Sequence, residues 1–122
     1  MSFEADWARC APWIDAALAH AGRTHGLSDV KAMILAGDAG FWPGRGAALV
    51  ATTEDDPGER RLLIWLAGGE LSELRTELLP QAEAWARACG CRRVLIIGRP
   101  GWERALKRHG FAPLARLIAK EL

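Results

Sequence analysis

The chain contains no tyrosine, only three cysteines and no long hydrophobic run, and each of these absences narrows the classes of protein to consider. A membrane-spanning helix needs about 18 or more consecutive apolar residues, and no such stretch occurs, so we expect no membrane partner. The opening residues MSFEADWARC carry acids where a secretory signal peptide needs a basic start and an apolar run. Cys10, Cys89 and Cys91 have no CxxC spacing, which favours reduced thiols in a cytoplasmic protein over a disulfide or a metal site.

The composition of the 122 residues is typical of one globular domain, with 50% hydrophobic residues, 25% charged residues and a formal net charge of +1. The six tryptophans are expected mainly as core and half-buried anchors, because an indole needs apolar walls and a partner for its N–H. His20, His25 and His109 are not spaced as a nucleophile–base set or as a metal site. The histidines therefore predict no catalytic residue.

Two helices are predicted first. Apolar residues recur at steps of three and four, at Trp7, Cys10, Ile14, Ala17, Leu18 and Ala21. Gly22 closes this helix, and Pro12 marks a bend or the helix start. Ser28 is predicted to cap a second, shorter helix that ends near Gly37.

The middle of the chain predicts an antiparallel hairpin. A short strand is expected at 41–42, and a longer one at 46–53. The DDPG turn at 55–58 then leads into a return strand at 61–66, which the glycine pair at 68–69 breaks.

The clearest helical face of the chain follows. It consists of Leu71, Leu74, Leu78, Ala82, Trp85 and Cys89. This face predicts a long helix with Trp85 buried against the sheet, a bend at Pro80 and an end at Gly90. The apolar run at 94–97 predicts a strand that is covered on both faces.

The C-terminal part begins with LIIGRPGWERALKRHGF, a strand followed by a turn and a short basic helix. Gly110 is expected to end that helix with a left-handed backbone, so that Phe111 turns back into the core. A last strand is predicted at 112–120. The sequence therefore predicts one α/β (α+β) domain over 1–122, with a mixed central sheet flanked by about four helices.

This order of elements resembles the Gcn5-related N-acetyltransferase (GNAT) fold, and RALKRHGF is similar to the family's short helix that ends in Gly-Phe after the fifth strand. The stretches IWLAGG, EAWARACGC and GRPGWERALKRHGF and the final KEL also resemble small GNAT-like proteins of tailed phages and prophages. That second resemblance implies a virion-associated location as the alternative to the cytoplasm.

The resemblance locates a cofactor turn, in which backbone N–H groups of the family cradle the pyrophosphate of acetyl-CoA at a helix start. If acyl-CoA binds, the implied cofactor-binding residues are Leu66, Gly68, Gly69, Glu70, Leu71, Ser72, Arg99, Arg104 and Lys107. The turn lacks the family's basic residue and Gly-x-Gly spacing, and Glu70 and Glu73 would meet the phosphates with like charge. We therefore expect no cofactor, with acetyl-CoA as the alternative, and a filled splay between the strands near 65–66 and 96–97.

The family's two proton-transfer roles have no matching residue in this chain. Leu106 stands where the family commonly has a tyrosine as general acid, and 61–66 contains no carboxylate to serve as general base. No catalytic residue is predicted. An acyltransferase could still work without the tyrosine, because water can protonate the leaving thiolate.

Basic residues gather near the C-terminus. Between Cys91 and Lys120 they are Arg92, Arg93, Arg99, Arg104, Lys107, Arg108, Arg116 and Lys120. Glu103 is the one acid of this stretch, so its local net charge is +7. A solvated basic face, an anionic cofactor tail, nucleic acid and an acidic protein partner are the open interpretations, with nucleic acid least favoured because no aromatic residue is interleaved with base-reading ones.

Three functions follow from these patterns. The preferred one is a phage-type GNAT-like protein without efficient acetyl transfer, which acts as a structural or protein-interaction domain on an acidic surface or a virion component. The alternative is an active acyl-CoA-dependent N-acyltransferase with an unusual cofactor turn. A nucleic-acid-binding accessory domain is the third.

Overall fold

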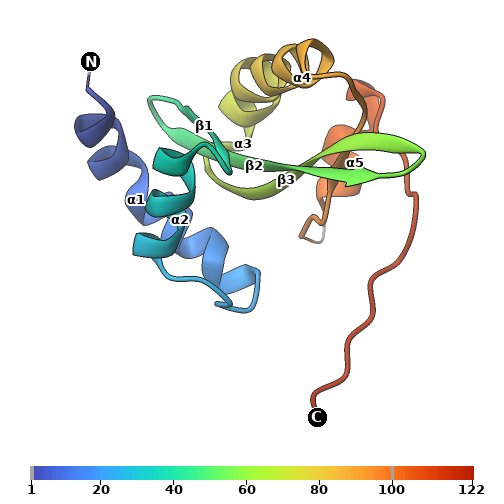
Figure 1. The fold of residues 1–122 in the computed structure, drawn as a ribbon, viewed down its shortest axis with the longest axis horizontal. Helices are drawn as coiled ribbons and strands as arrows, with labels where there is room; N and C mark the ends of the chain where they lie inside the picture. Colours follow the sequence, from blue (N-terminus) through green and yellow to red (C-terminus); the bar gives the residue numbers. More distant parts are fainter. Residues whose placement is uncertain (1, 100) are drawn as a thin grey trace.

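The computed structural model describes residues 2–99 and 101–122, which are built around a four-stranded mixed sheet (Figure 1). Strands β1 (Gly40–Pro43), β2 (Ala47–Asp56) and β3 (Glu59–Gly69) form an antiparallel meander, and β4 (Cys91–Ile96) pairs with β3 in parallel. The predicted hairpin and mixed sheet are confirmed. The predicted break at 68–69 is wrong, because both glycines pair with β2 and extend β3.

The two N-terminal helices are confirmed as α1 (Phe3–His20) and α2 (Leu27–Ala36). The predicted cap of α2 is wrong, because Ser28 lies inside the helix and Gly26 is the N-cap residue. The Asp29 carboxylate accepts a 2.8 Å hydrogen bond from the Gly26 N–H, so an acid one residue beyond Ser28 satisfies the helix start.

The long helix is continuous from Leu71 to Ala88, as α3 (Leu71–Glu73), a π-helical segment (Leu74–Leu78) and α4 (Leu79–Ala88). The prediction that Trp85 is buried is wrong, because its exposed fraction is 41%. A π turn holds about one residue more than an α turn, which rotates the following helix. After this turn the helix buries Leu79, Ala82 and Ala86 instead of Trp85.

The short basic helix is confirmed as α5 (Trp102–Leu106), which continues as a 3₁₀ turn (Lys107–His109). Gly110 ends it with φ of +87°, in the left-handed region predicted for a helix stop. Phe111 turns back and packs against the core, as expected.

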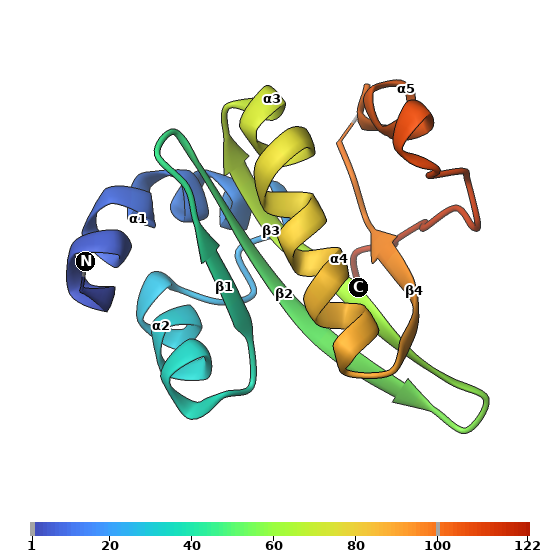
Figure 2. The same ribbon diagram turned by 90° about the horizontal axis from the view of Figure 1, so that it is seen from above.

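The sheet carries a core on each face, because inward-pointing residues alternate along β2. Leu49 and Ala51 face the long helix and α5, whereas Ala48 and Val50 face α1 and α2. Viewed from above, the long helix lies across the sheet, with α1 and α2 at the β1 side and α5 beyond β4 (Figure 2). No helix among the described residues has the length and apolar character to cross a membrane.

The predicted last strand is wrong, because residues 112–122 form no strand and run away from the body as a C-terminal tail (Figure 1). An extended segment becomes a strand only when its backbone pairs with a neighbour, and the tail pairs with none of the described strands. Its large apolar side chains are all exposed, at Leu114, Leu117, Ile118 and Leu122.

The expectation that residues 94–97 are covered on both faces is also wrong. β4 is an edge strand whose apolar side chains are only half-buried, and the exposed fraction of Ile97, just beyond it, is 66%. The apolar run predicted burial from composition, but β4 lies at the edge of the sheet, where the other described elements cover its side chains only partly.

Candidate cofactor site

The turn between β3 and α3, predicted as the cofactor turn, is packed against the protein's own backbone. Gly69 has φ of +95°, and a Cβ atom added there would lie 2.2 Å from the carbonyl oxygen of Gly46. A Cβ atom at Gly68 would lie 2.5 Å from the carbonyl oxygen of Trp13 in α1. The Leu66 side chain is buried in the core on the α1 side. These glycines thus allow a close approach between chain segments.

Two carboxylates occupy the start of the long helix. The Glu73 carboxylate accepts hydrogen bonds from the backbone N–H groups of Gly46 at 2.7 Å and Arg45 at 3.1 Å. The Glu70 N–H donates to the Gly46 carbonyl at 2.8 Å, and the Glu70 carboxylate lies over Gly46. The positive partial charge of the N–H groups at a helix start stabilises both carboxylates. The same partial charge would stabilise a phosphate bound at this place.

The other two predicted residues of this turn are exposed. Leu71 has an exposed fraction of 39%, and Ser72 is likewise open to solvent. The Ser72 carbonyl accepts a 2.8 Å hydrogen bond from the Thr76 hydroxyl one turn further on.

The splay between β3 and β4 is present and is bridged by a side chain. The paired ladder ends at Ile64 and Ile96, whereas β3 continues to Gly69. Across this gap, Nη2 of Arg99 donates a 2.6 Å hydrogen bond to the carbonyl oxygen of Ala67. The Arg99 guanidinium also lies 5.4 Å from the centre of the Trp102 ring, which is cation–π geometry.

Trp102, the first residue of α5, is partly buried between α5 and the core beneath the long helix. Its side chain packs against the core on that face and approaches Gly98 so closely that an added Cβ atom there would lie 3.0 Å from the Trp102 Cβ. The cavity left between the two helices has a volume of about 20 Å³. Arg75 also lines it, and its Nε is buried without a hydrogen-bond partner.

A larger cleft, of about 480 Å³, opens on the α1 side of the splay. Its walls include Trp65 and Ala67 of β3, Ile97 beyond β4, and both Arg99 and Trp102. His20 from the end of α1 also lines it. The bridge from Arg99 to Ala67 therefore lies between this cleft and the small cavity beside the long helix.

The two remaining predicted residues, Arg104 and Lys107, are exposed on α5 and the 3₁₀ turn that follows it. Neither forms an ion pair with another described residue. Leu106, in the family's tyrosine position, is buried in the core. The structure thus does not bring these two cations to the β3–α3 turn by any direct contact.

Two cysteine thiols have a raised pKa. Burial raises the pKa of the Cys10 thiol, and burial together with the neighbouring Cys89 raises the pKa of Cys91. A raised pKa keeps a thiol protonated at neutral pH, so neither is activated as a nucleophile. The His25 ring packs edge-on against Trp65 with centroids 4.8 Å apart, which is a packing role.

Two contacts near the β3–α3 turn were not predicted from the sequence. The resemblance implies Arg99 as a cofactor-binding residue, but its partner is a backbone carbonyl 32 residues away. Glu73 was interpreted as a charge that repels phosphate, but it also tethers the β1–β2 turn. The Arg-x-x-Trp spacing is a local signal only for the contact between Arg99 and Trp102, and no local pattern marks either of these two hydrogen-bonded contacts.

The strand order, the parallel β3–β4 pair with its splay and the long helix after β3 define the GNAT-like acetyltransferase fold. The wild-type TTHA1254 protein of Thermus thermophilus matches with a TM-score of 0.69 and 18% identity, over 99% of this chain and 93% of that one. A Trypanosoma brucei acetyltransferase matches with a TM-score of 0.61 and 15% identity, over 79% of this chain and 78% of that one. A probable acetyltransferase matches with a TM-score of 0.65 and 12% identity, over 100% and 93%.

At these identities the similarity establishes the fold alone. No protein-family model and no curated protein matches this sequence. The chain therefore has a GNAT-like fold, and a shared fold does not by itself define an activity.

Proposed function

We propose that this protein is a GNAT-fold domain without efficient acetyl transfer, which works as a structural or protein-interaction domain. The observation that carries the proposal is the bridge across the splay, where Arg99 donates to the Ala67 carbonyl and lies over Trp102. In the family this gap receives the pantetheine arm of acetyl-CoA. Here the Arg99 side chain spans this gap to the Ala67 carbonyl, and the cavity on the long-helix side of the bridge, about 20 Å³, is far smaller than ordinary ligand pockets of about 300–1,000 Å³.

Electrostatics at the helix start support the same proposal. Glu70 and Glu73 bring two carboxylates to the place where the cofactor's pyrophosphate would bind, and hydrogen bonds to Arg45 and Gly46 hold Glu73 there. The cations Arg104 and Lys107 are exposed, so their attraction is screened within about 8–10 Å. The residues present thus fit acetyl-CoA poorly.

Isothermal titration calorimetry with acetyl-CoA tests the proposal. The expected dissociation constant is no tighter than about 1 mM, or about −4 kcal/mol. A micromolar dissociation constant for the unaltered protein would overturn the proposal and favour an acyltransferase.

A double variant, Arg99→Ala with Trp102→Ala, examines the reason for weak binding. If the bridge and the indole fill the cofactor route, the double variant should gain measurable heat with acetyl-CoA. Arg104→Ala is the matched control, because it also removes one arginine but from the exposed face of α5. Equal heats from the unaltered protein, the double variant and Arg104→Ala would indicate that Glu70 and Glu73, and not the bridge, cause the weak binding.

The interaction role is supported by what the C-terminal part leaves exposed. Six of its eight cations have no ion-pair or hydrogen-bond partner among the described side chains: Arg92, Arg104, Lys107, Arg108, Arg116 and Lys120. The tail adds four exposed large apolar side chains to this surface. The resemblance of IWLAGG and GRPGWERALKRHGF to phage-encoded proteins makes a virion component one such partner.

Acyl transfer remains the second candidate, because one observation favours it. The cleft of about 480 Å³ on the α1 side has apolar walls with one arginine and one histidine, which is the usual character of a small-molecule site. The buried Nε of Arg75 also lacks a partner beside the cofactor route. Release of free CoA from acetyl-CoA in the presence of a primary amine would support this candidate.

A further inference from the structure

The outer edge of β4 is open. β4 is the last strand of the sheet and pairs with β3 alone. Its residues make no backbone hydrogen bond to any other segment within 2–99 and 101–122. From above, β4 lies at the side of the sheet opposite β1, and the chain after α5 passes it without forming a ladder (Figure 2). An unpaired edge of this kind is a template for one more strand.

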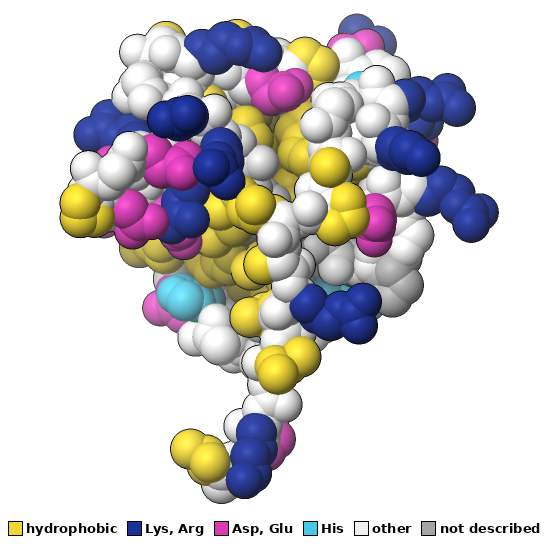
Figure 3. Space-filling model, turned by 90° about the vertical axis from the view of Figure 1, so that its right-hand side faces the viewer, with side chains coloured by type: hydrophobic (Ala, Val, Ile, Leu, Met, Phe, Trp, Pro, Cys, Tyr) yellow, Lys and Arg dark blue, Asp and Glu magenta, His cyan; other side chains and the backbone are white. Residues whose placement is uncertain are grey.

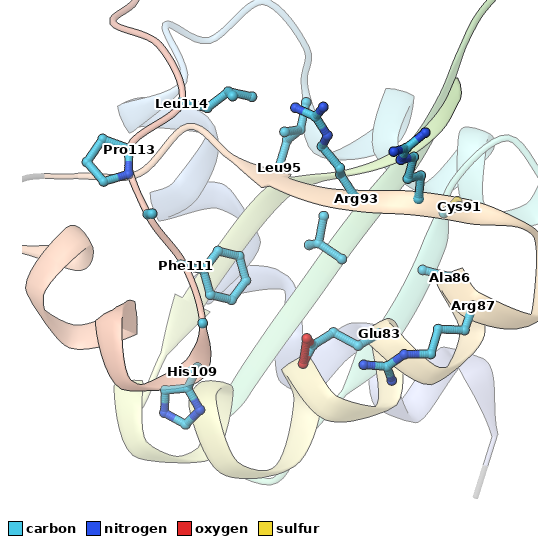
Figure 4. A pocket seen from close by; sticks show the side chains of 14 residues that line it. Glu83, Ala86, Arg87, Cys91, Arg93, Leu95, His109, Phe111, Pro113 and Leu114 are labelled. Atoms are coloured by element: carbon cyan, nitrogen blue, oxygen red, sulfur yellow. The ribbon is translucent and has the colours of Figure 1, made fainter. Parts of the chain in front are cut away.

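A groove of about 440 Å³ lies along this edge. Ala86 of the long helix, Val94 of β4 and Phe111 supply its apolar lining. Figure 4 shows the Phe111 ring beside β4, with Pro113 and Leu114 near one end of the strand and Cys91 and Arg93 toward the other. An added strand would bury alternate side chains against this apolar lining.

The charges around the groove are mainly positive. Arg87, Arg92 and Arg93 line it together with Glu83. Arg93 lies 3.3 Å from a carboxylate oxygen of Glu59 and is partly neutralised, whereas Arg87 and Arg92 have no ion-pair partner among the described residues. On this side of the molecule hydrophobic side chains lie in a hollow whose rim carries many Lys and Arg side chains (Figure 3).

These charges argue against a second copy of this chain as the occupant. Pairing of β4 with another β4 would bring Arg92 and Arg93 toward the same residues of the other copy. The tail of another copy would bring Arg116 and Lys120 to the same groove. Like charges across paired strands are destabilising, and arginines on an edge strand are a known means of preventing self-association.

We propose that the outer edge of β4 binds an extended segment of a partner protein, with acidic side chains alternating with apolar ones, as an added β-strand. The proposal rests on the interaction role proposed above and names its site and the partner's chemistry. Backbone hydrogen bonds to β4 supply the pairing, the groove beside Val94 and Phe111 takes the apolar side chains, and Arg87 and Arg92 select the acidic ones.

The probe is a labelled seven-residue peptide of alternating valine and glutamate with blocked ends, followed by fluorescence anisotropy. Two control peptides carry lysine in place of glutamate, or N-methyl groups at alternate backbone positions that remove the ladder donors. The glutamate peptide is expected to bind at least tenfold more tightly than either control, and to weaken as salt rises. Equal binding of the glutamate and lysine peptides, or no binding of the glutamate peptide, would overturn the proposal.

Charge-reversal variants locate the site. Arg92→Glu and Arg87→Glu should each weaken binding of the glutamate peptide at least fivefold and strengthen binding of the lysine peptide. Arg108→Glu is the matched control, because it makes the same charge change outside the groove lining. An equal loss in all three variants would show a nonspecific basic surface and would refute the edge site.

Two measurements on the free protein complete the test. The outward-facing amides of β4, which do not donate to β3, should exchange rapidly with deuterium and become protected when the glutamate peptide is added. Protection of these amides without peptide would mean that the chain's own tail already pairs with β4. A dimer at micromolar concentration in sedimentation would mean that a second copy of the chain pairs with β4. Either result would overturn the proposal. Micromolar acetyl-CoA binding would instead refute the absence of acetyl transfer and leave the peptide result unchanged, so the two failures are distinguishable.

Discussion

The carboxylate of Glu73 accepts a 2.7 Å hydrogen bond from the backbone N–H of Gly46, although 27 residues separate them in the chain. This contact joins the start of the long helix to the turn between β1 and β2. It places an acid at the helix start as a structural tether, with the N–H of Arg45 as a second donor to the same carboxylate.

Removal of this tether should lower stability. Glu73→Ala leaves two backbone donors without their acceptor, and we expect the free energy of unfolding to fall by about 1–3 kcal/mol in urea denaturation. Glu73→Gln keeps one acceptor oxygen and should lose less. Glu77→Ala, on an exposed position of the same helix, is the control and should change stability by under about 0.5 kcal/mol. Equal losses at both positions would contradict the tether.

Gly69 should tolerate no side chain. Gly69→Ala combines a positive φ, which disfavours alanine by about 1–2 kcal/mol, with a clash against the Gly46 carbonyl. We expect a large loss of thermal stability or an insoluble product. Gly58→Ala, in the hairpin turn with nothing within 4 Å of an added Cβ, should behave almost like the unaltered protein. A stable, soluble Gly69→Ala protein would contradict the packed turn.

Trp85 should contribute less than a core residue. Its ring meets Trp42 edge-on with centroids 5.7 Å apart, and such a pair is worth about 0.5–1.5 kcal/mol beyond its buried area. Trp85→Ala should therefore lower the free energy of unfolding less than Leu78→Ala, for which about 2–5 kcal/mol is expected at a buried position. Chemical denaturation of the two variants gives the comparison, and the reverse order would contradict the exposed position of Trp85.

The buried thiol of Cys10 should make stability fall at alkaline pH. Burial raises the pKa of this thiol in the folded protein, so the unfolded chain loses its proton first. The stabilisation is complete below the ordinary thiol pKa of about 8.5 and is lost as the pH rises through the folded pKa. Urea denaturation between pH 7 and 10 should show a steeper fall for the unaltered protein than for Cys10→Ala. Parallel pH profiles would contradict the assignment.

Local patterns in the sequence were sufficient for the elements that depend on neighbouring residues. The DDPG turn predicted the hairpin, and the glycine after the basic helix predicted its left-handed stop at Gly110. Both depend on backbone preferences within a few residues. The continuous apolar run AALVA at 47–51 of β2 is buried on both faces, and the helices that cover those faces come from distant parts of the chain, which the run itself does not identify.

The predictions that were wrong have a different cause, because the structures concerned depend on residues far away in the sequence. The segment 112–120 has the composition of a strand, but no described strand pairs with it. Trp85 follows a regular helical spacing that the π-helical segment interrupts, and no residue type specifies a π turn. At the candidate site, the sequence located the turn at Gly68 and Gly69 but not the residues that fill it, because the Arg99 bridge joins segments 32 residues apart.

The π-helical segment Leu74–Leu78 has a consequence for how this chain could change in evolution. A π turn holds one residue more than an α turn, so the residues after it face the sheet one position later in the sequence than in an uninterrupted α-helix. A descendant that had lost one exposed residue there, such as Thr76, would convert the segment to a plain α turn and keep Leu74 and Leu79 on the sheet. Most helices lose their packing register when one residue is deleted. In this helix, one residue of the π turn could be lost while the same apolar residues still face the sheet.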